Sequence, residues 1–110
     1  MNHAEEAVMV WPVLAFSARM QRVITYSELE GLTGILAVGL NAPLHSIHLY
    51  CERKGYPLLN SIVVNQKSGF PGEAFPKKLT AAEYLVEHAR VFAFGWTSEK
   101  KPRKEDFEVS

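Results

Sequence analysis

The segment that most constrains the fold spans residues 24–72, and it begins with a strong helix-start signal. Thr25 and Glu28 have the spacing of a capping box, in which each side chain accepts a backbone N–H from the other residue. This spacing predicts a helix over residues 26–33. Gly34 follows the last residue of that helix, where glycine readily takes the left-handed conformation that ends many helices.

A second helix is predicted over residues 42–54, after a short apolar stretch. Asn41 precedes it as an N-cap, and Pro43 falls in its first turn, where the missing N–H costs little. Gly55 follows as its stop. The positions i, i+3 and i+7 form the expected buried stripe, made of Leu44, Ile47 and Cys51. Polar residues fall on other faces, which we expect to be exposed: His45, Ser46, His48, Glu52, Arg53 and Lys54.

A strand and a hairpin are predicted after the second helix. Residues 58–65 are rich in residues that favour strands, and a turn follows at 66–69. Gly69 can take the positive φ that a hairpin turn requires. Residues 70–75 return as a short strand, which Pro71 confines to an edge or a bulge. This order predicts an α+β winged helix-turn-helix, with about three helices and a small antiparallel β-hairpin or sheet.

The regions on either side of this segment are also predicted to be helical. Residues 5–20 repeat apolar side chains at helical spacing, with a start or a kink expected near Pro12. Thr80 and Glu83 form a second capping box, which predicts a helix over residues 81–94. Its expected inner face consists of Leu85, His88, Val91 and Phe92.

The length and the charge bound the domain organisation. The chain has 110 residues, and we interpret residues 1–96 as a single winged-helix-like domain. Residues 97–110 are charged and lack periodicity, so we expect a flexible tail. Twelve basic residues balance twelve acidic ones, which argues against tight non-specific binding to nucleic acid. Residues 67–104 nevertheless hold eight basic and four acidic residues, an excess of four positive charges.

The compartment follows from the N-terminus and from the cysteine content. The first residues are acidic, and no apolar run approaches the roughly 20 residues that span a bilayer. Cys51 is the only cysteine, so an intrachain disulfide is impossible. These features predict a protein of the reducing cytoplasm.

Four short motifs suggest a known family. Thr25-Tyr26-Ser27-Glu28 resembles a Thr-Tyr-Gly-Gln helix start, and Leu36-Ala37-Val38-Gly39 resembles an Arg-x-Val-Gly motif. The run Leu58-Leu59-Asn60-Ser61-Ile62-Val63-Val64 is similar to Ile-Pro-Cys-His-Arg-Val-Val, and residues 69–75 resemble a glycine-rich hairpin that ends in an aromatic residue. In this order, over about half the chain, the motifs resemble the DNA-binding domain of the alkylguanine-DNA alkyltransferases and alkyltransferase-like proteins. The same combination also resembles small uncharacterised bacterial proteins.

The resemblance implies DNA binding without alkyl transfer. Asn60 stands where the family keeps its alkyl-accepting cysteine, and an amide offers no thiolate. Ser61 stands at the position of the activating histidine. Leu36 replaces the arginine that fills the place of a flipped nucleotide. We therefore expect no enzymatic activity and no cofactor.

The sequence leaves three functional hypotheses. In the first, a non-catalytic winged-helix protein with a role in regulation, DNA repair or defence binds double-stranded DNA. Its expected contacts are Tyr26, His45, Ser46, His48, Arg53, Lys54 and Lys67. In the second, the same scaffold is a protein-interaction or oligomerisation module. In the third, His45, His48 and Glu52 on one helix face form a metal site. The DNA sequence, the protein partner and the oligomeric state stay open.

Overall fold

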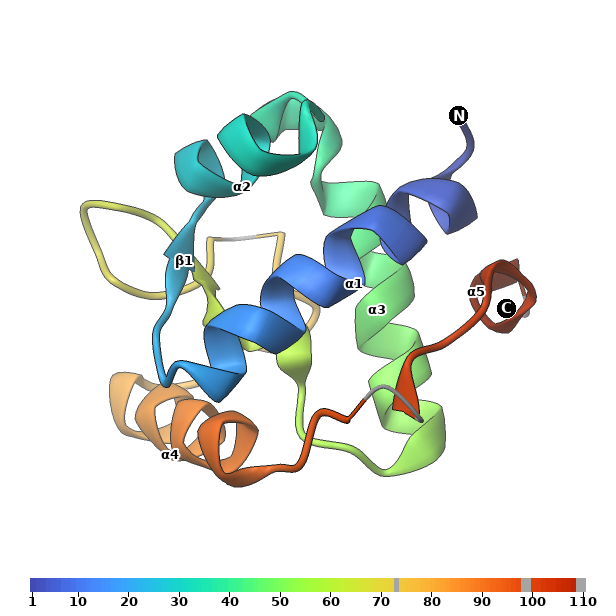
Figure 1. Cartoon of the computed structure of the whole chain (residues 1–110). Helices are drawn as coiled ribbons and strands as arrows, with labels where there is room; N and C mark the ends of the chain where they lie inside the picture. Colours follow the sequence, from blue (N-terminus) through green and yellow to red (C-terminus); the bar gives the residue numbers. More distant parts are fainter. Residues whose placement is uncertain (73, 98–99, 109–110) are drawn as a thin grey trace.

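The computed structural model describes residues 1–72, 74–97 and 100–108 (Figure 1). Its elements are α1 (His3–Arg19), β1 (Ile24–Thr25), α2 (Tyr26–Thr33), the 3-10 helix η1 (Ala37–Gly39), α3 (Asn41–Lys54), the 3-10 helix η2 (Leu59–Ile62), β2 (Val63–Val64), α4 (Ala81–Ala93) and α5 (Lys104–Glu108). The core lies where α1 packs against α3 and η2, with α2, α4 and α5 around it.

The first helix is one continuous element that contains Pro12. It begins earlier than predicted because Asn2 and Glu5 form a third capping box. Pro12 does not end the helix. Its side chain lies on the exposed face, so the backbone carbonyl that loses a partner can bind water instead. The buried face packs Val10 and Leu14 into the core.

The two predicted central helices are present, and one of their caps differs from the prediction. Thr25 caps α2 through its capping box with Glu28, and Gly34 follows with a φ of 78°. Gly55 ends α3 with a φ of 71°. Asn41, however, is the first residue of α3 and not its cap. Leu40 takes that place with no side-chain cap, because η1 leads directly into α3 and Leu40 already has a helical conformation.

The second and third helices cross at a large angle. The axis of α2 and the axis of the segment Ala37–Lys54 are bent by 96° across a short turn that contains Gly34. Two helices at about 90–120° joined by a turn of three or four residues have helix-turn-helix geometry. Among the described residues no single helix has the length and the apolar composition to cross a membrane, and this bent pair meets those criteria only when taken together.

The predicted fold class is wrong, because the sheet is not the antiparallel hairpin of a winged helix. Helices dominate, and the described residues contain one sheet of two short parallel strands. Ile24 pairs with Val63, and Thr25 pairs with Val64. Of the predicted strand 58–65, Leu59–Ile62 form η2, which side chains of α4 hold in place, and Val63–Val64 form β2. The described residues of the returning segment, 70–72 and 74–75, form no strand, since Pro71 cannot donate to a ladder.

In place of the predicted hairpin, residues 65–70 form a turn closed by backbone hydrogen bonds. The Asn65 N–H donates to the Phe70 carbonyl at 2.8 Å, and the Gly69 N–H donates to the Asn65 carbonyl at 2.8 Å. Gly69 has a φ of 75°, as its predicted turn position requires. Ring stacking of Phe70 on Tyr84 at 5.6 Å then directs the chain toward α4.

Both C-terminal predictions need correction in detail. Helix α4 has the predicted capping box of Thr80 and Glu83, but Leu85 points to solvent with 59% of its surface exposed. The inner face is made of Tyr84, Glu87, His88 and Val91. The segment expected to be an unstructured tail contains α5. Its Phe107 is buried beside α1 and α3, so this segment belongs to the packed body.

Candidate functional site

A buried amide, Asn60, lies at the centre of the candidate site. Its side chain belongs to η2, and only 3% of the residue is exposed. Two side chains of α4 hold η2 from both ends. The Leu58 N–H donates to Glu87 Oε2 at 2.7 Å, and the His88 Nε2 donates to the Ser61 carbonyl at 2.7 Å. These bonds occupy backbone groups that a regular strand would have used, and they fix where Asn60 lies.

Four polar side chains form a chain from Asn60 to the surface. Asn60 Nδ2 lies 3.1 Å from His48 Nδ1, and His48 Nε2 lies 3.5 Å from Glu52 Oε2. The same oxygen lies 3.6 Å from Lys77 Nζ. Because the Asn60 amide donates to Nδ1, we assign the His48 proton to Nε2, facing Glu52. The histidine thereby fixes the orientation of the amide.

Burial keeps His48 neutral. Desolvation lowers the pKa of this imidazole below its usual 6.5, and the nearby Glu52 carboxylate opposes that effect only in part. A neutral ring can accept from Asn60 while it donates to Glu52, whereas a protonated ring could not accept. With both nitrogens occupied, His48 is a positioning group and not a free base.

The outward side of Asn60 borders a small cavity. Tyr26, Asn41, His45 and Phe75 are among the residues that line it together with Asn60. Its volume is about 10 Å³, close to the minimum for one water molecule. Asn60 Oδ1 has no hydrogen-bond partner within the described part of the chain. This carbonyl oxygen is therefore an unused hydrogen-bond acceptor in the interior beside the cavity.

Tyr26 lines the same cavity. It is the first residue of α2, and its hydroxyl makes a backbone hydrogen bond with Gly72. Burial raises the pKa of this phenol, so the hydroxyl stays protonated at neutral pH. The start of α2 and the loop before α4 are thereby joined at the edge of the cavity.

A wider depression of about 540 Å³ adjoins the cavity and shares Phe75 with it. Lys77 and Lys78 are exposed along it, next to Tyr84. Their place in the site was missed in the sequence, where they counted only toward the charge excess. The available signal was two adjacent cations directly before the capping box of α4.

The predicted DNA-contacting residues do not all lie together. Tyr26 and His45 line the cavity, and the Ser46 hydroxyl donates back to the Ala42 carbonyl at 3.3 Å. Lys67 is exposed in the turn after β2. His48 was expected on an exposed face and is instead 1% exposed, because it turns inward to Asn60. It cannot contact a groove.

Two predicted cations lie at the other end of α3. Lys54 is nine residues after His45, roughly 14 Å along the helix axis. Arg53 donates to the carbonyl of Asp106 in α5, and the side chains of Arg53 and Lys54 lie over the Tyr50 ring. The structure therefore separates Arg53 and Lys54 from the cavity.

The described part of the chain contains neither a cluster of metal ligands nor a reactive thiol. No three side chains of His, Cys, Asp or Glu come together there as possible ligands. His48 uses its nitrogens for Asn60 and Glu52, and His45 points elsewhere as an exposed residue. Cys51 is fully buried, as predicted, and burial raises the pKa of its thiol to about 12.

Comparison of the chain with protein-family models, with curated proteins and with solved structures found no match.

Proposed function

We propose that this chain is a non-catalytic DNA-binding protein that places the first half of α3 in the major groove of a duplex. The observation that carries the proposal is the 96° crossing of α2 and the segment Ala37–Lys54. In helix-turn-helix proteins the second helix enters the groove and its N-terminal residues contact the bases. The winged-helix form is not part of the proposal.

The surface around the start of α3 suits such a contact. His45 is exposed in the second turn of the helix and offers ring nitrogens to base edges. Leu36 and Val38, in the turn before α3, expose 65% and 87% of their surface. Apolar side chains at that place can contact thymine methyl groups.

Phosphate contacts are assigned to Lys67, Lys77 and Lys78. All three are exposed, and Lys77 and Lys78 line the depression beside the cavity. Lys77 is already 3.6 Å from Glu52, so Lys67 and Lys78 are the better contacts. Because the whole chain is neutral, we expect few phosphate contacts and modest non-specific affinity.

The absence of catalysis is proposed from Asn60. A buried amide held by His48 has no nucleophilic atom, and the only thiol in the sequence is buried at Cys51. The resemblance to alkyltransferase DNA-binding domains supports DNA as the ligand, with the reactive residue replaced. Incubation with alkylated DNA should leave the protein mass unchanged. A stable alkyl adduct would contradict this part of the proposal.

A binding assay tests the proposal. Anisotropy titrations would use double-stranded, single-stranded and alkylated DNA at two salt concentrations. We expect duplex binding that weakens with salt, because each phosphate contact releases counterions. The Lys78→Ala and Lys67→Ala variants should each weaken binding to all sequences and lower the salt slope by about one unit. His45→Ala should instead change sequence preference, by about 1–3 kcal/mol for a good base contact.

A matched control comes from the same helix. Lys54→Ala removes a cation of the same kind at the far end of α3 and should leave affinity and salt slope unchanged. Loss of affinity in Lys54→Ala would mean that α3 lies along the groove and does not enter it end-on. If the unmutated chain binds no duplex at low salt, the DNA proposal fails. The exposed Leu36 and Val38 then favour a protein-docking function.

A further inference from the structure

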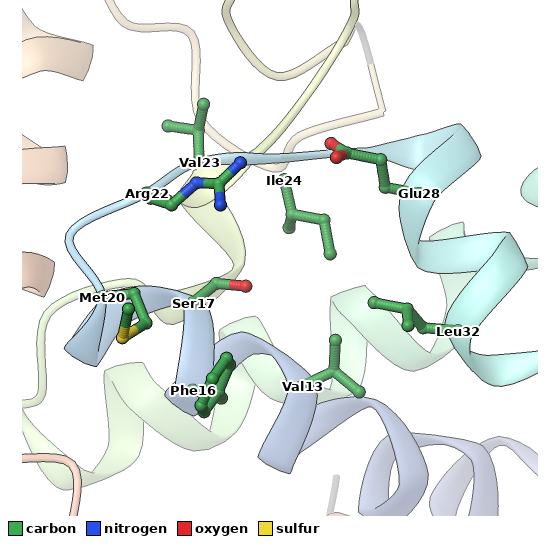
Figure 2. A pocket seen from close by; sticks show the side chains of 9 residues that line it. All are labelled: Val13, Phe16, Ser17, Met20, Arg22, Val23, Ile24, Glu28 and Leu32. Carbon is green, nitrogen blue, oxygen red and sulfur yellow. The ribbon is translucent and has the colours of Figure 1, made fainter.

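A groove lies between α1 and α2, on the part of the molecule where β1 begins (Figure 2). Its volume is about 210 Å³. The apolar side chains that line it include Val13, Phe16, Met20, Val23 and Leu32. Phe16 and Leu32 expose 57% and 68% of their surface, values far above those of core residues. Large apolar side chains that gather around one depression mark an interaction site.

The sequence of α1 also indicates that this face of the helix is covered by a partner. Val10 and Leu14 form its buried face, while Val13, Phe16 and Met20 form a second apolar stripe at i, i+3 and i+7. A helix that is apolar on opposite faces is normally covered on both. In this structure α3 and η2 cover one face of α1, and the second stripe borders the groove.

Two side chains of opposite charge lie along one edge of the groove. Figure 2 shows Arg22 and Glu28 on either side of Ile24 along its upper edge. A two-fold axis through the groove would place Arg22 of one copy opposite Glu28 of the second copy, and the reverse. Such a self-complementary arrangement is the requirement for a symmetric dimer. An unrelated partner would have to supply both charges in the opposite order.

We infer that the groove between α1 and α2 is the interface between two copies of this chain, related by a two-fold axis. The four most exposed apolar side chains of the groove form the apolar centre, namely Phe16, Met20, Val23 and Leu32, and the two Arg22–Glu28 pairs form the rim. A single groove gives an interface at the small end of the range, below about 1,200 Å² in total. The expected dimer is therefore weak and reversible, with a dissociation constant in the micromolar range.

This inference goes beyond the proposed DNA function and does not depend on it. Successive residues of a helix are rotated by about 100°, so Glu28 lies about 200° from Tyr26 around α2. The dimer surface and the cavity thus use opposite faces of the same helix. A monomer that still binds DNA would overturn only the dimer, and a dimer that binds no DNA would overturn only the DNA proposal.

Sedimentation velocity of the full chain from about 10 µM to about 1 mM tests the inference. We expect a concentration-dependent monomer–dimer equilibrium. Phe16→Glu should weaken the dimer by at least about tenfold, because it places a charge in the apolar centre. Leu85→Glu, at an equally exposed leucine of α4, is the matched control and should leave the equilibrium unchanged. A wild-type chain that stays monomeric over the whole range would overturn the inference and assign the groove to a different occupant.

A mixing experiment identifies the symmetry. Arg22→Glu alone and Glu28→Arg alone each create two like-charged contacts, so each chain should be monomeric. An equimolar mixture of the two variants restores both opposite-charge contacts and should form a heterodimer. Glu28 also caps α2, so circular dichroism must first show that the Glu28→Arg chain is folded. If it is unfolded, Glu28→Gln, which can keep the cap, should dimerise with Arg22→Glu more tightly than Arg22→Glu does with itself. Folded variants that fail to pair in the mixture would contradict the two-fold arrangement.

Discussion

Single polar side chains in the interior differ in whether their hydrogen bonds are made. The Asn60 NH2 group is bonded to His48, whereas Asn60 Oδ1 and Ser61 Oγ have no partner in the described part of the chain. A buried polar group without a partner costs about 1–3 kcal/mol relative to a satisfied one.

Replacing Ser61 by alanine should therefore be neutral or stabilising, by up to about 1 kcal/mol. Thr33→Val is a suitable comparison, because the Thr33 hydroxyl donates to the Leu29 carbonyl at 2.8 Å and accepts from the Ile35 N–H at 3.2 Å. That variant should lose about 1 kcal/mol. Urea denaturation measures both free energies. A loss of more than about 1 kcal/mol in Ser61→Ala would show that the hydroxyl has a partner in solution.

Acid should destabilise the fold through His48. The pKa of His48 is lower in the folded chain than in the unfolded chain, so the unfolded chain binds the proton first as the pH falls. The contribution to stability is fully present above the unfolded value near 6.5 and is lost as the pH falls toward the lowered folded pKa. The free energy of unfolding, measured from pH 8 to pH 5, should fall over this range. In His48→Gln the decline should be shallower, and an identical decline would assign it to other groups.

The Cys51 thiol should be inert in the folded protein. With a pKa of about 12, on the order of one thiol in ten thousand is ionised at pH 8. A disulfide reagent such as Ellman's reagent should react only when the chain unfolds. The labelling rate in native buffer and in denaturant measures this difference. Fast labelling in native buffer would mean that α3 opens locally.

At the scale of helices and strands, short-range signals decide the boundaries. The Thr80 hydroxyl accepts the Glu83 N–H at 3.2 Å, and the Glu83 carboxylate accepts the Thr80 N–H at 2.8 Å. Thr80→Ala should cost about 1 kcal/mol, while Thr80→Ser should cost much less because it keeps the hydroxyl. Denaturation midpoints of the two variants give the comparison. Equal losses would show that the methyl group of Thr80 matters more than the cap.

The same signals explain which parts of the fold the sequence predicts. Helices α2 and α4 begin where Thr25 and Thr80 place them, because a capping box involves only residues three positions apart. The strand predicted at residues 58–65 is present only at Val63–Val64, because distant residues decide the conformation of Leu59–Ile62. The side chains of Glu87 and His88 in α4 bond to the Leu58 N–H and the Ser61 carbonyl, which a strand would use for its own ladder. No local sequence pattern indicates these long-range hydrogen bonds.

The candidate site shows the same division. Placing His45 on an exposed face follows from helical spacing, and the structure confirms it. His48 was placed with it, although its partner Asn60 lies twelve residues away. A histidine next to the buried stripe of a helix is satisfied by whichever polar group the fold brings there. Only the tertiary structure identifies that group.

At the scale of the whole molecule, the C-terminal segment closes the core. Phe107 of α5 lies 5.5 Å from the Tyr50 ring and 6.3 Å from the Trp11 ring, between centroids. Burying one phenylalanine contributes about 1.5–3 kcal/mol. Phe107→Ala should therefore lose about that much unfolding free energy, measured by urea denaturation, and a chain that ends at Lys101 should lose at least as much because it also lacks the buried Pro102. A truncated chain as stable as the full one would return this segment to the flexible tail predicted from the sequence.

Both tryptophans of the chain lie in this same aromatic group, with the rings of Trp11 and Trp96 5.6 Å apart. Each is only 2% exposed, and the group lies against the second half of α3, away from His45. Intrinsic fluorescence is thus an optical probe of one half of the molecule alone. Quenching by added DNA would not report contact of DNA with the first half of α3. It would report a rearrangement transmitted along α3, and a silent emission spectrum would be compatible with full binding.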